Sequence, residues 1–176
     1  MRHRQKFLLF RIYRFRDTEA YGELYEFFVP RIRRYISFRV ADVAVAEELT
    51  AEVFLRGWEY ATASLVKNPG ALFYRIAKNV IADFYRKRKA EVDIEEVAEP
   101  ESKEEPVSET MVLQAEQANL LANLKELKEE YRDVLVMKYL DEMSVAEIAE
   151  VLEKTKNNVR VLLHRAKKAL RQQMEK

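Results

Sequence analysis

Apolar side chains recur every three or four positions along most of the chain, and this spacing predicts amphipathic α-helices. Residues 17–66 carry several such stripes in succession and are predicted to be helical. Pro30 falls between two of these stripes, where it predicts a kink or a new helix start. No segment alternates apolar and polar residues as a strand does, so the pattern predicts an all-α protein.

A turn signal closes this first helical region. Asn68, Pro69 and Gly70 favour irregular backbone, and together they predict a loop over residues 61–70. Helical spacing resumes after the loop and predicts a helix from about residue 71 to about residue 89. We therefore expect the first domain to end with that helix.

The composition changes after this helix. Residues 91–116 hold ten acidic side chains and one basic one, and Pro100 and Pro106 lie among them. This segment offers too little apolar surface to offset the entropy cost of ordering the chain. Residues 90–112 are therefore predicted to form a flexible acidic linker between two small helical domains.

Helical spacing returns in the last third of the chain and predicts a second domain over residues 113–176. One helix is expected within Met111–Leu127 and another over about 129–140. A pair of helices follows over 144–171, with a short break at Glu153–Thr155.

The last two predicted helices have the sequence pattern of a helix-turn-helix. Ser144 and Glu147 have the spacing of a capping box, which marks the start of the first helix. Thr155 can cap the second helix. Ala149 and Ala166 are small residues at positions where two helices can cross closely.

The outward face of the second helix in this pair carries the chemistry for reading DNA. At about 100° per residue, one side of the helix holds Asn157, Arg160, Val161, His164, Lys168 and Arg171, with Arg165 at its edge. Arg and Asn can each pair bidentately with a base edge in the major groove. The alternative interpretation is an amphipathic hairpin with a basic solvent face.

The stretch FYRIAKNVIADFYRKRK, residues 73–89, also divides into two faces on a helix. Phe73, Ile76, Ala77, Val80, Ile81 and Phe84 form its apolar side, and Arg75, Lys78, Asn79, Ala82 and Arg86 form its polar side, with Asp83 at the boundary. The basic side chains suit phosphates and the amide of Asn79 suits a base edge. Tyr74 and Tyr85 lie off the centre of the apolar stripe, where packing at a domain edge is favoured over base stacking.

The formal net charge of +1 conceals separated blocks of charge. Residues 1–16 carry six basic side chains and no acidic one, 67–90 carry seven basic and one acidic, and 154–176 carry eight basic and one acidic. Such blocks favour a polyanionic partner, and solvated helix faces are the alternative.

Several function classes are disfavoured by composition. The chain has no Cys and only two His, and it lacks a phosphate-cradling glycine-rich loop, so we expect neither an enzyme nor a metal or cofactor site. The apolar run Phe7–Phe10 is too short for a signal-peptide core or a membrane span. We therefore expect a soluble, cytoplasmic protein.

Three motifs in order resemble the sigma-70 family of RNA polymerase sigma factors. AEELTAEVFLRGW (46–58) is similar to its core-binding region, and residues 73–89 are similar to its promoter-reading helix YRIARN…DYLRRR. VRVLLHRAKKALR (159–171) is similar to the end of its helix-turn-helix. The short two-domain layout resembles the extracytoplasmic function group, with sigma region 2 at 17–89 and sigma region 4 at 113–176.

The resemblance implies a role for each surface. Core polymerase, through the clamp of its largest subunit, would be bound by Glu47, Glu48, Leu49, Thr50, Glu52, Val53 and Phe54. The minus-ten promoter element would be faced by Arg75, Lys78, Asn79, Asp83 and Arg86, and the 61–70 loop would hold a flipped base. The minus-thirty-five element would be read by Thr155, Lys156, Asn157, Asn158, Arg160, Val161, His164, Arg165 and Lys168.

The resemblance further implies promoter DNA and an anti-sigma protein as partners, no enzymatic activity, and a role in DNA melting. A stand-alone helix-turn-helix regulator is the alternative function. Two positions depart from the family pattern, because Glu153 stands where the turn usually has Gly and Leu72 where Trp is frequent. Glu153 predicts a turn of altered shape, since a left-handed residue other than Gly costs about 1 kcal/mol. Residues 1–16 match no family motif and are either a basic extension or the start of the first helix.

Overall fold

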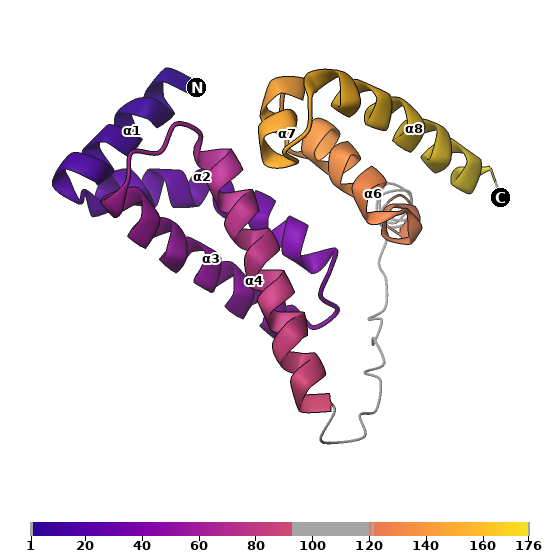
Figure 1. Ribbon diagram of the computed structural model, residues 1–176, viewed down its shortest axis with the longest axis horizontal. Helices are drawn as coiled ribbons and strands as arrows, with labels where there is room; N and C mark the ends of the chain where they lie inside the picture. The colour runs from indigo at the N-terminus through magenta and orange to yellow at the C-terminus, as the bar shows by residue number, and fades with distance from the viewer. Residues whose placement is uncertain (1, 93–119, 121, 176) are drawn as a thin grey trace, which may run out of the picture. The chain divides into compact units, whose positions relative to one another are not determined.

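The computed structural model describes residues 2–92, 120 and 122–175, and every regular element in these ranges is a helix (Figure 1). The all-α fold class is thereby confirmed. The chain divides into two compact units, Met1–Ala98 and Glu99–Lys176, which we call the N-terminal and C-terminal units. Most of the predicted acidic linker lies outside the described residues. Within the described ranges, no helix is long and apolar enough to cross a membrane.

The N-terminal unit contains four helices: α1 (Arg2–Phe15), α2 (Thr18–Ser37), α3 (Val43–Ala63) and α4 (Pro69–Val92). Helix α2 packs against each of the other three, and α3 also packs against α1 and α4. The side chains of Asp17 and Asp42 accept hydrogen bonds from backbone amides in the first turns of α2 and α3. Both helices therefore start where an acidic N-cap satisfies otherwise unpaired N–H groups.

Helix α2 continues through Pro30, so the new helix start that was one of the two alternatives predicted there is wrong. A proline inside a helix removes the hydrogen bond to the carbonyl four residues earlier, here that of Glu26. Both Pro30 and Glu26 are exposed, so water can satisfy that carbonyl without breaking the helix.

Aromatic rings form the centre of the N-terminal unit. The ring of Phe73 lies 5.2 Å from that of Phe28 and 4.8 Å from that of Phe54, measured between centroids. Tyr21 stacks edge-on against Trp58 at 5.1 Å, and its hydroxyl donates a hydrogen bond to the carbonyl of Phe54. Burial raises the pKa of Tyr21, as expected for a phenol that is removed from water. These rings hold α2, α3 and α4 together.

The connection between α3 and α4 is shorter than the predicted 61–70 loop, because helix continues to Ala63 and restarts at Pro69. Asn68 accepts a hydrogen bond from the backbone N–H of Ala71 at 3.1 Å, so it acts as a side-chain cap for α4. Proline fits the first position of a helix because the N–H that it lacks would have no partner there.

The C-terminal unit is built from several short helical segments and one long helix, α8. Residues 122–126 are helical, and they are followed by α6 (Glu129–Leu135), the π-helical turn η1 (Val136–Leu140), α7 (Val145–Val151) and α8 (Lys156–Met174). The helix predicted over 129–140 is confirmed, although its second half is a π-helix. The most deeply buried side chains of this unit are Val134, Met137, Ile148, Val159 and Ala166. They belong to α6, η1, α7 and α8, so a single small core joins all four elements.

Candidate nucleic-acid interface

Helix α7 begins with the capping box that the sequence predicted. The Glu147 backbone N–H donates to Ser144 Oγ at 3.3 Å, and the Ser144 backbone N–H donates to Glu147 Oε2 at 2.9 Å. The Ser144 hydroxyl also donates to Glu147 Oε2, at 2.6 Å. These bonds fix the first residue of α7 and therefore the register of the helix pair.

The turn between α7 and α8 keeps a left-handed residue even though it has no glycine. Glu153 has a φ of 54°, and the Lys154 N–H donates to the Ala149 carbonyl at 3.0 Å, as in a Schellman motif. The altered turn shape predicted from Glu153 is therefore wrong. Packing between α7 and α8 offsets the cost of about 1 kcal/mol that the left-handed conformation of Glu153 carries.

Helix α8 separates its buried side chains from its exposed ones. Thr155 caps it by accepting a hydrogen bond from the Asn158 N–H at 3.1 Å, and Val159, Leu162 and Leu163 are buried. All nine side chains that the sequence analysis placed at a minus-thirty-five element are exposed: Thr155, Lys156, Asn157, Asn158, Arg160, Val161, His164, Arg165 and Lys168. The beginning of α8 thus presents Asn and Arg to solvent on a supported helix, which is the geometry that fits a major groove.

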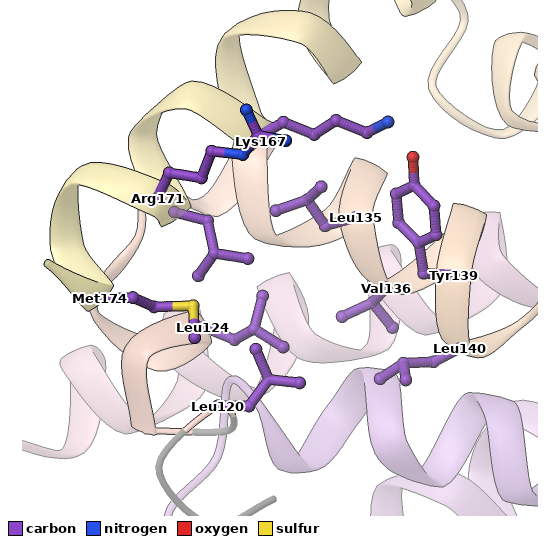
Figure 2. Close-up of a pocket in the computed structure, with 10 residues that line it drawn as sticks. Leu120, Leu124, Leu135, Val136, Tyr139, Leu140, Lys167, Arg171 and Met174 are labelled. Carbon is purple, nitrogen blue, oxygen red and sulfur yellow. The ribbon is translucent and has the colours of Figure 1, made fainter. Parts of the chain in front are cut away.

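The far end of α8 contributes to a different surface. A pocket of about 320 Å³ has a mostly apolar lining: Leu120, Leu124, Leu135, Val136, Tyr139, Leu140, Lys167, Leu170, Arg171 and Met174 (Figure 2). The Lys167 ammonium lies 5.1 Å from the centroid of the Tyr139 ring. The long basic side chains of Lys167 and Arg171 therefore border this apolar hollow.

Helix α4 presents a second polar face, on the N-terminal unit. Its buried side holds Phe73, Tyr74, Ala77, Val80 and Ile81. Arg75, Lys78, Asn79 and Arg86 are exposed, and Asp83 is half-buried. The structure thus brings the predicted minus-ten residues to one surface of a helix that is held by the aromatic core.

The two tyrosines of this stretch pack within the unit. Tyr74 is only 1% exposed and its ring meets that of Tyr35 edge-on at 5.1 Å. Tyr85 is partly exposed, and its hydroxyl donates to the carbonyl of Arg39. Tyr74 is therefore a core residue, which helical spacing alone did not reveal because its partner comes from α2.

An ion-pair chain that the sequence analysis missed joins α3 to α4. Arg56 lies 2.6 Å from Glu52 and 3.4 Å from Asp83, and Asp83 lies 2.6 Å from Arg86. Asp83 therefore positions two arginines beside the polar face of α4. The four-residue spacing of Glu52 and Arg56 was a detectable signal for the first pair, but nothing in the sequence connects Arg56 to Asp83.

The predicted core-binding segment lies on α3. Leu49, Thr50, Val53 and Phe54 are buried, whereas Glu47 and Glu48 are exposed and Glu52 is half-buried. Glu47 also pairs with Arg33 at 2.6 Å. The accessible part of this segment is therefore an acidic edge, and the four buried residues support it from behind.

Two family models match the chain. Residues 24–91 match Sigma-70 region 2, and residues 117–170 match Sigma-70, region 4. The first match covers most of α2 together with α3 and α4. The second covers α6, η1, α7 and most of α8.

Two curated relatives are sigma factors. The chain is 28% identical over 158 residues to the ECF RNA polymerase sigma factor BldN of Streptomyces coelicolor, which covers 88% of this chain and 60% of BldN. It is 28% identical over 169 residues to the ECF RNA polymerase sigma factor SigW of Bacillus subtilis, covering 90% of each chain. The chain therefore spans less than two thirds of BldN but nearly all of SigW.

Two solved structures share the fold. CnrH, in complex with the cytosolic domain of CnrY, has a TM-score of 0.69 at 20% identity and covers 98% of this chain and 97% of its own. The sigma factor RpoE of Bartonella quintana, in complex with the anti-sigma factor NepR, has a TM-score of 0.65 at 18% identity and covers 89% of this chain and 98% of its own. At these identities the likeness concerns the fold alone.

Proposed function

The chain belongs to the sigma-70 family of RNA polymerase sigma factors, in its extracytoplasmic function group, and we propose that it binds core polymerase and directs it to promoters. One observation carries this proposal: each unit contains one matched family region and presents an exposed face of Arg, Lys and Asn on a buried support. A stand-alone helix-turn-helix regulator is not favoured, because it would leave the N-terminal unit without a role.

The C-terminal unit is proposed to read the minus-thirty-five element as duplex DNA. Asn157 and Arg160 lie in the first turns of α8, where a recognition helix contacts base edges. Lys168 lies two turns further along and suits a phosphate. Sequence would then be read near the start of the helix, and affinity would be added along its length.

The N-terminal unit is proposed to hold the minus-ten element while the strands are opened. Arg75, Lys78 and Arg86 supply positive charge on the exposed side of α4, and Asn79 supplies an amide that can pair with a base. Asp83 fixes Arg86 through their ion pair. The short 64–68 connection at the start of α4 is the proposed place for a flipped base.

Core polymerase is proposed to dock on the acidic edge of α3. Glu47 and Glu48 are exposed there, and carboxylates on a rigid helix complement a basic helical partner such as the clamp of the largest subunit. The buried side chains of Leu49 and Val53 hold this edge in place. We therefore assign direct contact to the acids and a supporting role to the apolar residues.

Sigma factors are non-catalytic initiation factors, so we infer that this chain performs no chemistry of its own and acts in the cytoplasm, where the polymerase is. An anti-sigma protein is a further proposed partner. RpoE of Bartonella quintana was solved bound to one, and that structure shares this fold.

In vitro transcription with purified components tests the proposal. The chain with core polymerase should yield transcripts from specific promoters, and neither component alone should do so. Size-exclusion chromatography at moderate salt should show a complex with core. Absence of that complex, combined with tight duplex binding by the chain alone, would replace the proposal with the stand-alone regulator.

A further inference from the structure

Arg56 bridges α3 and α4, and no part of the proposed function assigns it a role. Its Nη2 atom lies 2.6 Å from Oε1 of Glu52, which is one turn earlier on α3. Its Nη1 atom lies 3.4 Å from Oδ2 of Asp83, which is on α4. The two terminal nitrogens of one guanidinium group therefore contact carboxylates on two helices.

Asp83 is shared between two partners in the same way. Its Oδ2 atom faces Arg56, and its Oδ1 atom accepts a hydrogen bond of 2.6 Å from Nη2 of Arg86. Each oxygen of this carboxylate thus serves a different arginine. The pair between Asp83 and Arg86 is made through one oxygen and one nitrogen.

Solvent exposure separates the roles of the two arginines. The side chain of Arg86 is 76% exposed, whereas those of Arg56 and Asp83 are 39% and 36% exposed. Arg86 is therefore the arginine of this ion-pair chain that a DNA phosphate can reach most easily. A guanidinium carries five N–H donors, so the other nitrogens of Arg86 stay available for that phosphate.

A bidentate pair with Asp83 would make Arg86 less available. Carboxylates and guanidinium groups favour two parallel hydrogen bonds, which occupy one whole edge of the guanidinium. A phosphate pairs with the same fork of donors and would compete for it. In this structure Arg56 contacts Oδ2 of Asp83, which is the oxygen that a bidentate pair with Arg86 would need.

A purely structural role for Arg56 is the alternative interpretation. Partly exposed ion pairs contribute little to stability. Helices α3 and α4 are already joined by the rings of Phe54 and Phe73, whose centroids lie 4.8 Å apart. Arg56 is therefore not required to hold the two helices together.

We propose that Arg56 is a positioning residue for the minus-ten face of α4. It holds one oxygen of Asp83, so that Asp83 orients Arg86 through a single hydrogen bond and leaves the rest of the guanidinium free for a DNA phosphate. This inference rests on the proposed function, in which Arg86 contacts the minus-ten element. Without Arg56, both oxygens of Asp83 turn to Arg86, and the resulting bidentate pair competes with the phosphate.

Side-chain NMR of the full chain without DNA tests the first step. The heteronuclear NOE at Nε of Arg86 reports how strongly this side chain is held on the ps–ns timescale. It should rise in Arg56→Gln, where Asp83 pairs with Arg86 through both oxygens, and fall in Asp83→Asn, where the ion pair is lost. Thermal unfolding of both variants should stay close to that of the unaltered chain. An Arg86 signal that does not respond to Arg56→Gln would overturn the inference.

Binding to DNA tests the second step. Arg56→Gln should weaken binding of the full chain to a fluorescent oligothymidine by about two- to fivefold, measured by anisotropy. Because this substitution also removes a positive charge, the decisive measurement is a double-mutant cycle. The loss should disappear in an Arg86→Gln background and persist in a Lys78→Gln background. Lys78 is exposed on the same polar face, about two turns from Arg86, and is not part of the ion-pair chain.

Two results of the binding measurements would contradict the inference. An equal loss in both backgrounds would mean that Arg56 acts through its charge alone. Equal binding by the unaltered chain and by Arg86→Gln would mean that Arg86 contacts no phosphate, whatever the NMR signal shows.

In vitro transcription with core polymerase separates this inference from the proposed function. Promoter-specific transcripts from the unaltered chain, together with an Arg86 signal that ignores Arg56→Gln, would overturn only the role of Arg56. A responsive Arg86 signal and the expected double-mutant cycle, without transcripts, would overturn only the proposed function.

Discussion

The ring of Phe73 occupies the space that a side chain on Gly57 would need. A Cβ built at Gly57 would lie 2.5 Å from Phe73 Cε1 and 2.9 Å from the hydroxyl oxygen of Tyr21. The backbone of α3 therefore approaches the Phe73 ring, which comes from the start of α4, closely at this point. The absence of a side chain at position 57 leaves room for that ring between the two helices.

Gly57→Ala should destabilise the N-terminal unit by about 1–3 kcal/mol, because the added methyl group forces aside a ring that is packed on every side. Urea unfolding followed by the fluorescence of Trp58, which lies in this unit, measures the effect. Gly22→Ala is the matched control, since nothing lies within 4 Å of a Cβ there. It should stabilise α2 by up to about 1 kcal/mol. Equal effects of the two substitutions would contradict the close approach.

Glu153→Gly should stabilise the C-terminal unit by about 1 kcal/mol, because glycine adopts a positive φ without the steric cost that Glu153 bears. Thermal unfolding followed by circular dichroism measures the change. Glu153→Ala removes the same carboxylate but keeps a Cβ, so it should give no comparable gain. A similar gain from both variants would show that charge, and not backbone conformation, is responsible.

Arg160→Ala should cost about 1–3 kcal/mol in binding to the preferred upstream element and relax discrimination at one position. The reason is that Arg160 stands exposed near the start of α8, where base edges are contacted. Competition between promoter variants in transcription assays measures this loss of discrimination. Lys168→Ala is the contrast: it should weaken all sequences alike and lower the salt slope. Unchanged discrimination in Arg160→Ala would assign this residue to a phosphate.

Asn79→Ala should impair promoter opening or minus-ten selectivity and leave binding to core polymerase intact. The reason is that the Asn79 amide is exposed and does not belong to the hydrophobic interior of the N-terminal unit. Permanganate footprinting of unpaired thymines measures opening, and gel filtration with core measures docking. Loss of core binding in this variant would mean that Asn79 is a structural residue.

Glu48→Lys should weaken the complex with core polymerase, most clearly at low salt, because it reverses a charge on the exposed acidic edge of α3. Surface plasmon resonance with immobilised core measures the affinity. Glu59→Lys makes the same change on the same side of α3, about 16 Å further along the helix, and should have a smaller effect. Equal losses would indicate a general charge effect and not a local contact.

The division of α4 and α8 into a buried face and an exposed face could be predicted from sequence, because it depends on the spacing of residues within one helix. The capping box at Ser144, the cap at Thr155 and the exposed run on α8 all follow from residues within a turn or two of each other. The same is true of the exposed polar residues of α4.

The features that sequence did not reveal depend on contacts between helices. Tyr74 is buried by Tyr35 of α2, and Asp83 is paired with Arg56 of α3. The close approach at Gly57 likewise exists only because Phe73 comes from another helix. Helix α2 passes through Pro30 because the affected side of the helix faces water. None of these can be read from the periodicity of one segment.

The strict division of α8 has a consequence for how such a protein can change over generations. The side chains that hold the helix, such as Val159 and Leu162, are different from those that face outward, such as Asn157 and Arg160. Selection for folding therefore acts on one set of codons and selection for DNA sequence on another. A duplicated gene can acquire a new set of target promoters by exchanging a few surface side chains, with its fold passed on unaltered.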